Sequence, residues 1–545
     1  MKKYSHIIIL GVVLLLGVLL RFYKLGEVPF GFFKDEAALG YNAFSIFKTS
    51  RDEFGVHLPV VFRSFEVFFL PLYVYLSSVV VGLLGLSEFS TRFLTALSGV
   101  AGLISVYLIT KEFWNRKIAL FTALILAISP WHIFYSRGSF EGNLALTLFS
   151  FGVFFWLKFT KTERLKHVFF SGLFFILSMY SYQAERLVVP FLGLILVSLS
   201  VKRLIKIRLK LIPIILIFIG LLIPLLSITF SAGGYHRASG VSIFAKSEKS
   251  PGYIEGLKIG FFQNNRVYLR TRQVASLYLS YFSPKNLFVN GDFDRQRSVV
   301  NFSVFYFWTL PFLLIGLFDF IKKITYEKKV ILTWVLLAPL PAALTGDPFH
   351  TYRSLLLYFP LTLMIGIGFG KVFVFLNSIQ KKWFISIVSV LLFFFLACFL
   401  YSYFYLTQTD RARSWDYGYK EIMSIIKTFP KESRIIFDDP WTEVYIHYLF
   451  FLKIDPVIYQ KEVESAGYPK DFYYSNISKL RPEKFGQVEF RHIDWPKERG
   501  DKGTYFVIYA PNLPESEFAT DPKVEVIKNI SYPNGNTAFR ILRIK

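Results

Sequence analysis

The sequence is poor in cysteine and in charge. Its only cysteine, Cys398, lies within an apolar run, which excludes both a disulfide within the chain and a metal site built from cysteines. Charged residues make up 18% of the chain, against about 25% in a typical soluble protein. Apolar residues take their place, at 53% of the 545 residues. This balance excludes an ordinary soluble protein.

Apolar runs of the kind that cross bilayers follow one another along most of the chain. A membrane helix needs about 20 mostly apolar residues. The runs lie near residues 4–23, 67–86, 90–110, 117–135, 142–160, 167–182, 187–201, 210–230, 303–320, 329–345, 354–376 and 383–406. No small-residue cleavage site follows the first run, so we expect a retained span rather than a signal peptide. The sequence therefore predicts an integral membrane protein with many spans.

The chain is short of acidic residues, with 38 Asp and Glu against 62 Lys and Arg, and its net charge is +24. In a soluble protein this excess would suggest a nucleic-acid partner. Here many of the cations lie in short loops between apolar runs, where the excess of positive charge on the cytoplasmic side of membrane proteins explains them. We therefore expect no nucleic acid among the partners.

One apolar run has to stay on the outer surface if the basic loops are to share one side. Residues 67–86 are the best choice, because Glu66 precedes the run and Pro71 interrupts it. With that change, the basic clusters that become cytoplasmic are those at 111–117, 158–166, 202–210, 322–329 and 381–382. The prediction is about eleven spans, a cytoplasmic N-terminus and a C-terminus outside.

Three long regions then lie outside the cytoplasm. Residues 24–89 form a first outer loop with an interfacial helix, and residues 231–302 form a second, basic outer loop that attracts either lipid headgroups or an anionic acceptor. Residues 407–545 mix a helical pattern with strand-like runs such as RIIFD and TYFVIYA, which predicts a small extracytoplasmic α+β domain. Residues 1–406 form the membrane part.

Four polar patches fall at the outer ends of the predicted spans. Ionisable groups at membrane depth are costly and usually functional. The patches contain Lys34, Asp35, Glu36, Arg137, Glu141, Glu185, Arg186, Asp347, His350 and Arg353. Because all of them lie on one predicted face, we expect them to converge on one polar cavity. The competing interpretation is that such charges only flank spans or extend toward water.

This set of side chains suits chemistry on a lipid phosphate. A carboxylate can take the proton from an attacking hydroxyl, and guanidinium groups bind and stabilise phosphate. If the segment around Asp35 and Glu36 is helical, the two side chains point about 100° apart, so that only one of them faces the cavity. The patches therefore indicate transfer of a group from a lipid phosphate to a hydroxyl-bearing acceptor.

The order of these segments resembles the GT-C glycosyltransferases of family 39, the protein O-mannosyltransferase group and its bacterial aminoarabinose-transferase-like relatives. The matching pieces are RFYKLG, KDEAALGYNAFSI, FFLPLYVYLSSVVVGLLGLSEFSTRFLTALSG and SPWHIFYSRGSFEGNLAL, and further on YFSPKNLFVNGDFDRQRSV and RSLLLYFPLTLMIGIG. The resemblance implies an all-α polytopic GT-C fold with juxtamembrane helices, in a bacterial plasma membrane.

The resemblance also implies a reaction and an acidic centre. The reaction is inverting transfer of a sugar from a polyprenyl-phosphate donor to a hydroxyl acceptor on the outer face. The acceptor is a protein, a lipid or an envelope glycan. The catalytic acid of the family's first outer loop falls on Asp35, with Glu36 beside it, and a second acidic position falls on Glu141. A divalent cation, if one is used, would be held by Asp35 and Glu141.

The donor phosphate needs cations. A lysine that several relatives carry before the PLYYYL-like stretch is absent here, where the sequence reads RSFEVFFLPLYVYL. The candidates that replace it are Arg137, Arg186, Arg353 and His350. Two other functions stay open. A lipid-linked saccharide transporter or flippase would more often show pseudo-symmetric halves, which the sequence lacks. A non-catalytic envelope scaffold would keep its function after Asp35→Asn.

Overall fold

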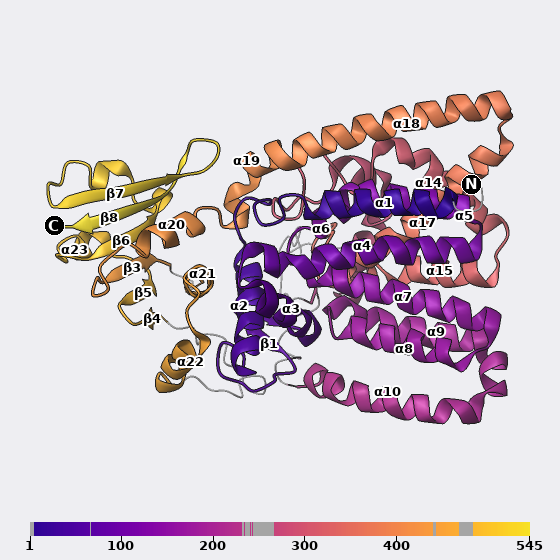
Figure 1. The fold of residues 1–545 in the computed structure, drawn as a ribbon, viewed down its shortest axis with the longest axis horizontal. Helices are drawn as coiled ribbons and strands as arrows, with labels where there is room; N and C mark the ends of the chain where they lie inside the picture. The colour runs from indigo at the N-terminus through magenta and orange to yellow at the C-terminus, as the bar shows by residue number, and fades with distance from the viewer. Residues whose placement is uncertain are drawn as a thin grey trace, which may run out of the picture.

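The computed structural model describes residues 5–65, 67–231, 266–439, 443–467 and 483–545, together with residues 234, 240, 242 and 243. Long helices lie side by side in a bundle, and a sheet-containing part stands at one end of it (Figure 1). Part of the second predicted outer loop, residues 232–233, 235–239, 241 and 244–265, lies outside the described residues. Its described part includes α13 (Arg266–Ser280).

The bundle is built from apolar helices that run back and forth along its long axis (Figure 1). They are α1 (Ser5–Phe22), α4 (Glu88–Phe113), α5 (Arg116–Ile128), α7 (Glu141–Thr162), α8 (Leu165–Met179), α9 (Gln183–Lys206), α10 (Arg208–Thr229), α14 (Leu310–Lys322), α15 (Tyr326–Leu337), α17 (Leu355–Phe375) and α18 (Ser378–Tyr401). Six helical segments of the described chain are long and apolar enough to cross a membrane. The protein is therefore an integral membrane protein, and the number of spans stays a prediction.

Burial separates the inner helices from the outer ones. Most of α17 is buried inside the bundle, whereas α10 and the long helical stretch that begins with α18 expose almost all of their apolar surface. A helix that is apolar all round and exposed belongs in lipid. Glycines let the inner helices approach closely, because a Cβ added at Gly316 of α14 would lie 2.0 Å from the carbonyl oxygen of Met364 in α17.

The first outer loop forms a platform across one end of the bundle. It contains α2 (Lys34–Thr49), a hairpin of β1 (Phe62–Ser64) and β2 (Val67–Phe69), and α3 (Pro71–Leu84). In Figure 1, α2 runs across the ends of the bundle helices rather than along them. With 14 residues, α3 is shorter than the roughly 20 that a span needs.

The C-terminal part, residues 419–545, is built on a six-stranded mixed sheet of order β4-β5-β3-β6-β8-β7. Its strands are β3 (Ile435–Asp438), β4 (Lys484–Phe485), β5 (Val488–Arg491), β6 (Tyr505–Tyr509), β7 (Val524–Ser531) and β8 (Thr537–Ile544), and its helices are α20 (Tyr419–Ile426), α21 (Tyr445–Phe451), α22 (Pro456–Ser465) and α23 (Trp495–Glu498). Strand β3 is parallel to both β5 and β6, and the other pairs are antiparallel. The runs RIIFD and TYFVIYA lie in β3 and β6.

One hydrophobic cluster joins the C-terminal part to the platform. It combines buried residues of α2 and α3 with residues of α20, α21, β3 and β6. At its centre the rings of Phe32 and Phe450 lie 4.5 Å apart. The C-terminal part is therefore packed on the first outer loop and lies at the end of the bundle where that loop sits (Figure 1).

Candidate active site

The structure brings all four polar patches to the end of the bundle that carries the platform. Successive helices alternate in direction, so the segments between them that hold the patches meet there (Figure 1). The hydrogen bonds that join the patches run from the Ser139 amide to Glu36 Oε1 at 2.8 Å, from the Gly142 amide to the Tyr352 hydroxyl at 3.0 Å, and from the Ser181 hydroxyl to the Glu141 carbonyl at 3.0 Å. The face expected from the loop charges is thus one connected region.

Asp35 lies in the first turn of α2, where its side chain is half-buried. The free N–H groups of a first turn carry partial positive charge, which favours a carboxylate there. Its neighbour in the chain, Glu36, lies about 100° further around the helix and is buried. The two acids therefore occupy different surroundings, as the helical geometry predicts.

Glu36 is held in a buried ion pair with Arg92 of α4. Arg92 Nε donates to Glu36 Oε1 at 2.9 Å, and Arg92 Nη2 donates to Oε2 at 2.8 Å. The Ser139 amide adds a third hydrogen bond. Two parallel bonds of this kind are the strongest geometry for an arginine and a carboxylate. The oxygens of Glu36 are thus engaged in holding α2 against α4, which suits a structural neighbour of Asp35.

Arg137, a predicted ligand of the donor phosphate, is held by groups of the protein itself. Its guanidinium is buried, whereas a phosphate ligand would have to face the cavity. The carbonyl oxygens that it contacts are those of Leu20 (3.1 Å), Arg21 (3.1 Å), Tyr23 (2.7 Å) and Val28 (3.1 Å). These groups include C-terminal carbonyls of α1, for which the helix itself supplies no N–H donor. Arg137 therefore ties the end of α1 to the turn that precedes α7.

Arg186 and Arg353, in contrast, line the same cavity. They come from the first turn of α9 and from the segment before α17, and both line one cavity of about 460 Å³. The rest of its lining is mainly apolar and includes Phe68 of β2, Leu187 of α9 and Leu344. This size and this mixture of apolar walls with a few charged groups are typical of ligand sites.

The segment before α17 supports Arg353 on two sides. Its Nη1 donates to Asp347 Oδ2 at 2.6 Å, and its backbone amide donates to Nδ1 of the buried His350 at 3.2 Å. Burial, followed by the nearby charges of Arg353 and Arg297, lowers the pKa of His350 to about 2. His350 is therefore neutral and fixes the backbone of Arg353, and it does not itself line the cavity of Arg186 and Arg353.

Glu141 begins α7 and is half-buried. Its side chain hydrogen-bonds with the Tyr352 hydroxyl. Burial, and after it the charge of Glu141, raises the pKa of Tyr352 well above its usual value. Tyr352 immediately precedes Arg353, so Glu141 is tied to the segment that carries one of the cavity arginines.

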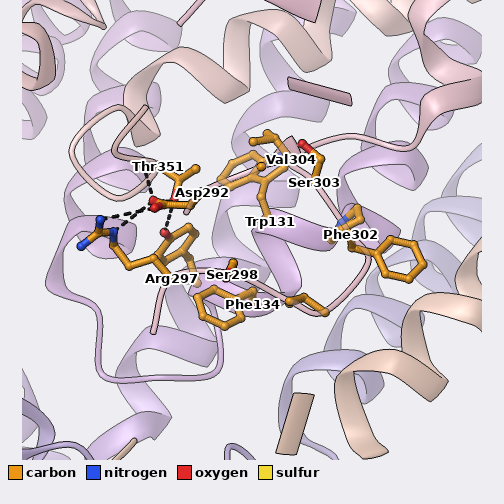
Figure 2. A pocket seen from close by; sticks show the side chains of 13 residues that line it. Trp131, Phe134, Asp292, Arg297, Ser298, Phe302, Ser303, Val304 and Thr351 are labelled. Carbon is orange, nitrogen blue, oxygen red and sulfur yellow. Dashed lines mark hydrogen bonds and ion pairs between the residues drawn. The ribbon is translucent and has the colours of Figure 1, made fainter. Parts of the chain in front are cut away.

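Sequence reasoning missed Asp292. Figure 2 shows Arg297 and Thr351 both reaching its carboxylate. Asp292 Oδ2 accepts from Arg297 Nε at 3.0 Å and from the Thr351 hydroxyl at 2.7 Å, which locks the second outer loop to the segment before α17. The space beside it is about 20 Å³, room for about one water molecule but not for a sugar. The signal in the sequence was the stretch NGDFDRQRS, in which acidic residues stand close to basic ones.

Within the residues that the structure describes, no group of three or more His, Cys, Asp and Glu side chains is placed to hold a metal ion. The predicted ligand pair, Asp35 and Glu141, would supply two carboxylates. This donor set is incomplete for a cation held by protein groups, because Mg²⁺ and Ca²⁺ take about six or more oxygen ligands. We therefore derive no step through a metal.

Part of the chain matches a known protein family, and its fold is similar to solved structures. Residues 70–228 match a family model described as dolichyl-phosphate-mannose-protein mannosyltransferase. The crystal structure of ArnT from Cupriavidus metallidurans in the apo state is similar over 98% of this chain and 97% of that chain, with a TM-score of 0.54 and 11% sequence identity. The structure of ArnT bound to undecaprenyl phosphate gives the same values.

A weaker likeness is to the Archaeoglobus fulgidus oligosaccharyltransferase in the apo form. It has a TM-score of 0.47 and 16% identity over 83% of this chain and 64% of that chain. A sequence comparison with curated proteins finds no match. At 11% identity the likeness to ArnT shows the fold. The chain therefore has the fold of ArnT, and its residues 70–228 are similar to the mannosyltransferase family model.

Proposed function

We propose that this protein transfers a sugar from a polyprenyl-phosphate donor to a hydroxyl group at the platform end of the bundle. The observation that carries the proposal is the cavity that Arg186 and Arg353 line together. The half-buried Glu141 is linked to it through Tyr352, the neighbour of Arg353, and the half-buried Asp35 lies in α2, at the same end of the bundle (Figure 1). Two cations in a mainly apolar cavity suit a ligand with a phosphate and a lipid chain. The family match over residues 70–228 and the fold of ArnT, which has been crystallised with undecaprenyl phosphate, support the same donor class.

In the proposed step, the acceptor oxygen attacks the anomeric carbon of the sugar. Asp35 accepts the hydroxyl proton as the new C–O bond forms. The bond between the anomeric carbon and the phosphate oxygen breaks, and the electron pair leaves with the lipid phosphate. A single displacement of this kind inverts the anomeric configuration.

Each residue then has one role. Arg186 and Arg353 bind the phosphate and stabilise the charge that grows on it as it leaves. Glu141 is proposed to orient the acceptor or the sugar, and its hydrogen bond with Tyr352 ties it to the backbone beside Arg353. Glu36, Arg137 and His350 hold the surrounding elements in place.

The proposed orientation follows from the basic loops. The C-terminal part and the platform lie outside the cytoplasm, and the N-terminus lies inside, because the short loops at the opposite end of the bundle carry the Lys and Arg clusters. The donor would then be used on the outer face of a plasma membrane. The acceptor is a hydroxyl of a protein, a lipid or an envelope glycan.

The test is transfer by the purified chain in detergent. A panel of polyprenyl-phosphate sugars is offered with a hydroxyl acceptor, and released polyprenyl phosphate is measured. We expect release with at least one donor, and a loss of about 100-fold or more in Asp35→Asn. The matched control is Glu27→Gln, an exposed acid of the same outer loop that pairs with Lys24, and it should transfer like the wild type.

A wild-type chain that releases no lipid phosphate from any donor of the panel would contradict the proposed reaction. Activity retained by Asp35→Asn would contradict the base, and would leave Glu141 as the next acid to replace.

A further inference from the structure

We propose that the C-terminal part positions the catalytic helix α2 through a cap that Asp416 supplies to its first turn. The inference rests on the proposed role of Asp35 and deepens it. The N-cap residue of α2, Phe33, has no side-chain acceptor for the first N–H groups of the helix. Such groups need an acceptor from elsewhere. Asp416 Oδ2 accepts from the Lys34 amide at 2.8 Å, across 382 positions of the chain.

A carboxylate is well suited to this place. An acceptor at the start of a helix satisfies one of its free N–H groups, and a negative charge there interacts favourably with the helix dipole. Lys34 is the first residue of α2 and Asp35 is the second. A hydrogen bond on the Lys34 amide therefore fixes the backbone directly beside the proposed base.

The segment around Asp416 leaves the loop before α2 little room to move. The backbone of Gly31 has a φ of +86°, and a Cβ added there would lie 2.1 Å from the carbonyl oxygen of Trp415. The Phe30 amide donates to Gln408 Oε1 at 2.5 Å. The loop that leads into Asp35 is therefore clamped by residues 408–416, which connect the last helix of the bundle to the C-terminal part.

Asp416 is in turn held from the C-terminal part. His447 Nε2 lies 3.5 Å from Asp416 Oδ2. The His447 ring is buried and stacks on Tyr419 with 4.5 Å between the ring centroids. An ion pair between the Lys34 side chain and Glu443 adds a second link across the same contact. The position of the cap thus depends on α20 and α21 being in place.

The other end of α2 is held by the same part of the chain. The side-chain amide of Gln460 in α22 donates to Ser45 Oγ at 3.0 Å, to Thr49 Oγ1 at 3.1 Å and to the Asp52 carbonyl at 2.8 Å. With both ends fixed, α2 cannot slide or tilt without breaking contacts to the C-terminal part. Asp416 is therefore a positioning residue for Asp35, and the C-terminal part belongs to the catalytic architecture.

The test compares Asp416→Ala with Asp416→Asn in the full chain. Alanine removes the acceptor, whereas the asparagine side-chain oxygen can still accept from the Lys34 amide. We expect Asp416→Ala to lower kcat roughly tenfold, as misplacement of a reacting group does. KM for the donor should stay within about twofold, because the arginines of the cavity are untouched. Asp416→Asn should recover kcat to within about threefold of the wild type.

The control is Asp521→Ala, which removes a similar hydrogen bond, to the Lys523 amide at 3.0 Å, from the turn before β7. It should leave kcat and KM unchanged. Hydrogen exchange gives a second readout that needs no activity: amides at the start of α2 should exchange faster in Asp416→Ala and at the wild-type rate in Asp416→Asn.

Two results would overturn the inference alone: an active Asp416→Ala with wild-type kcat, or a loss of kcat that asparagine does not restore. Absence of transfer by the wild type would overturn the proposed function and this inference with it.

Discussion

Two sets of arginines lie at the platform end of the bundle, and they differ in what surrounds them. Arg92 and Arg137 are buried, and their guanidinium groups are occupied by Glu36 and by backbone carbonyls. Arg186 and Arg353 line a cavity of about 460 Å³. The first set joins helices to loops, and the second set is placed to meet a ligand. The same residue type at the end of a span thus serves structure or chemistry according to burial.

If the two sets differ in this way, replacements in the buried set should lower stability and leave the KM of the donor unchanged. Replacements at the cavity should raise that KM and change stability little.

The largest effect is expected for Arg92→Ala. It leaves the Glu36 carboxylate buried without its partner, which costs about 3 to 5 kcal/mol in comparable sites. Thermal unfolding in detergent, followed by tryptophan fluorescence, measures the loss. An unfolding midpoint within a degree or two of the wild type would show that the buried pair does not hold α2 against α4.

Arg137→Lys should cost about 2 to 3 kcal/mol, because an ammonium group cannot reach all four carbonyl oxygens and leaves buried acceptors unsatisfied. The KM for the donor should remain that of the wild type. A higher donor KM with an unchanged unfolding midpoint would assign Arg137 to the phosphate site and contradict the distinction between buried and cavity-lining arginines.

His350 allows a test by pH. Its pKa is about 2 in the folded protein and about 6.5 in an unfolded chain, so the unfolded state binds the proton first as the pH falls. Stability is therefore unaffected above pH 6.5 and decreases below it, by about 2 kcal/mol between pH 7 and pH 5. The measurement is the unfolding midpoint at the two pH values. His350→Gln should lack this part of the dependence, and an identical dependence in the variant would contradict a buried, neutral His350.

The smallest change in stability is expected for Arg186→Ala. Loss of one charge-assisted contact to phosphate should raise the KM for the donor roughly tenfold or more, while the unfolding midpoint moves little. Titration with polyprenyl phosphate in place of the full donor separates binding of the phosphate from binding of the sugar. An unchanged affinity for polyprenyl phosphate would exclude this cavity as the phosphate site.

Much of the fold could be predicted because bilayer physics leaves few choices. Apolar runs must form helices, and the basic loops set which ends share a side, so residues as distant as Asp35 and Arg353 were expected at one face. The helical angle between Asp35 and Glu36 also indicated that only one of them would face the cavity. The residues alone could not predict that Glu36 is the buried one of the two, because its partner, Arg92, lies 56 positions away and its distance depends on helix packing.

The burial of Arg137 could not be predicted for the same reason. Arg137, Arg186 and Arg353 look alike in sequence, each at a span end beside other polar residues. Burial of Arg137 follows from the position of the end of α1, and no local pattern reports that position. Asp292 was missed because its partners, Arg297 and Thr351, come together only when the second outer loop packs on the segment before α17.

The most direct measurement of the central claim is a comparison of donor binding and turnover in Asp35→Asn. If Asp35 is the base, the variant binds the polyprenyl-phosphate sugar with the Kd of the wild type. It releases lipid phosphate at a rate that is lower by about 100-fold or more. Release within a factor of about two of the wild type, at equal binding, would contradict the assignment of Asp35 as the base.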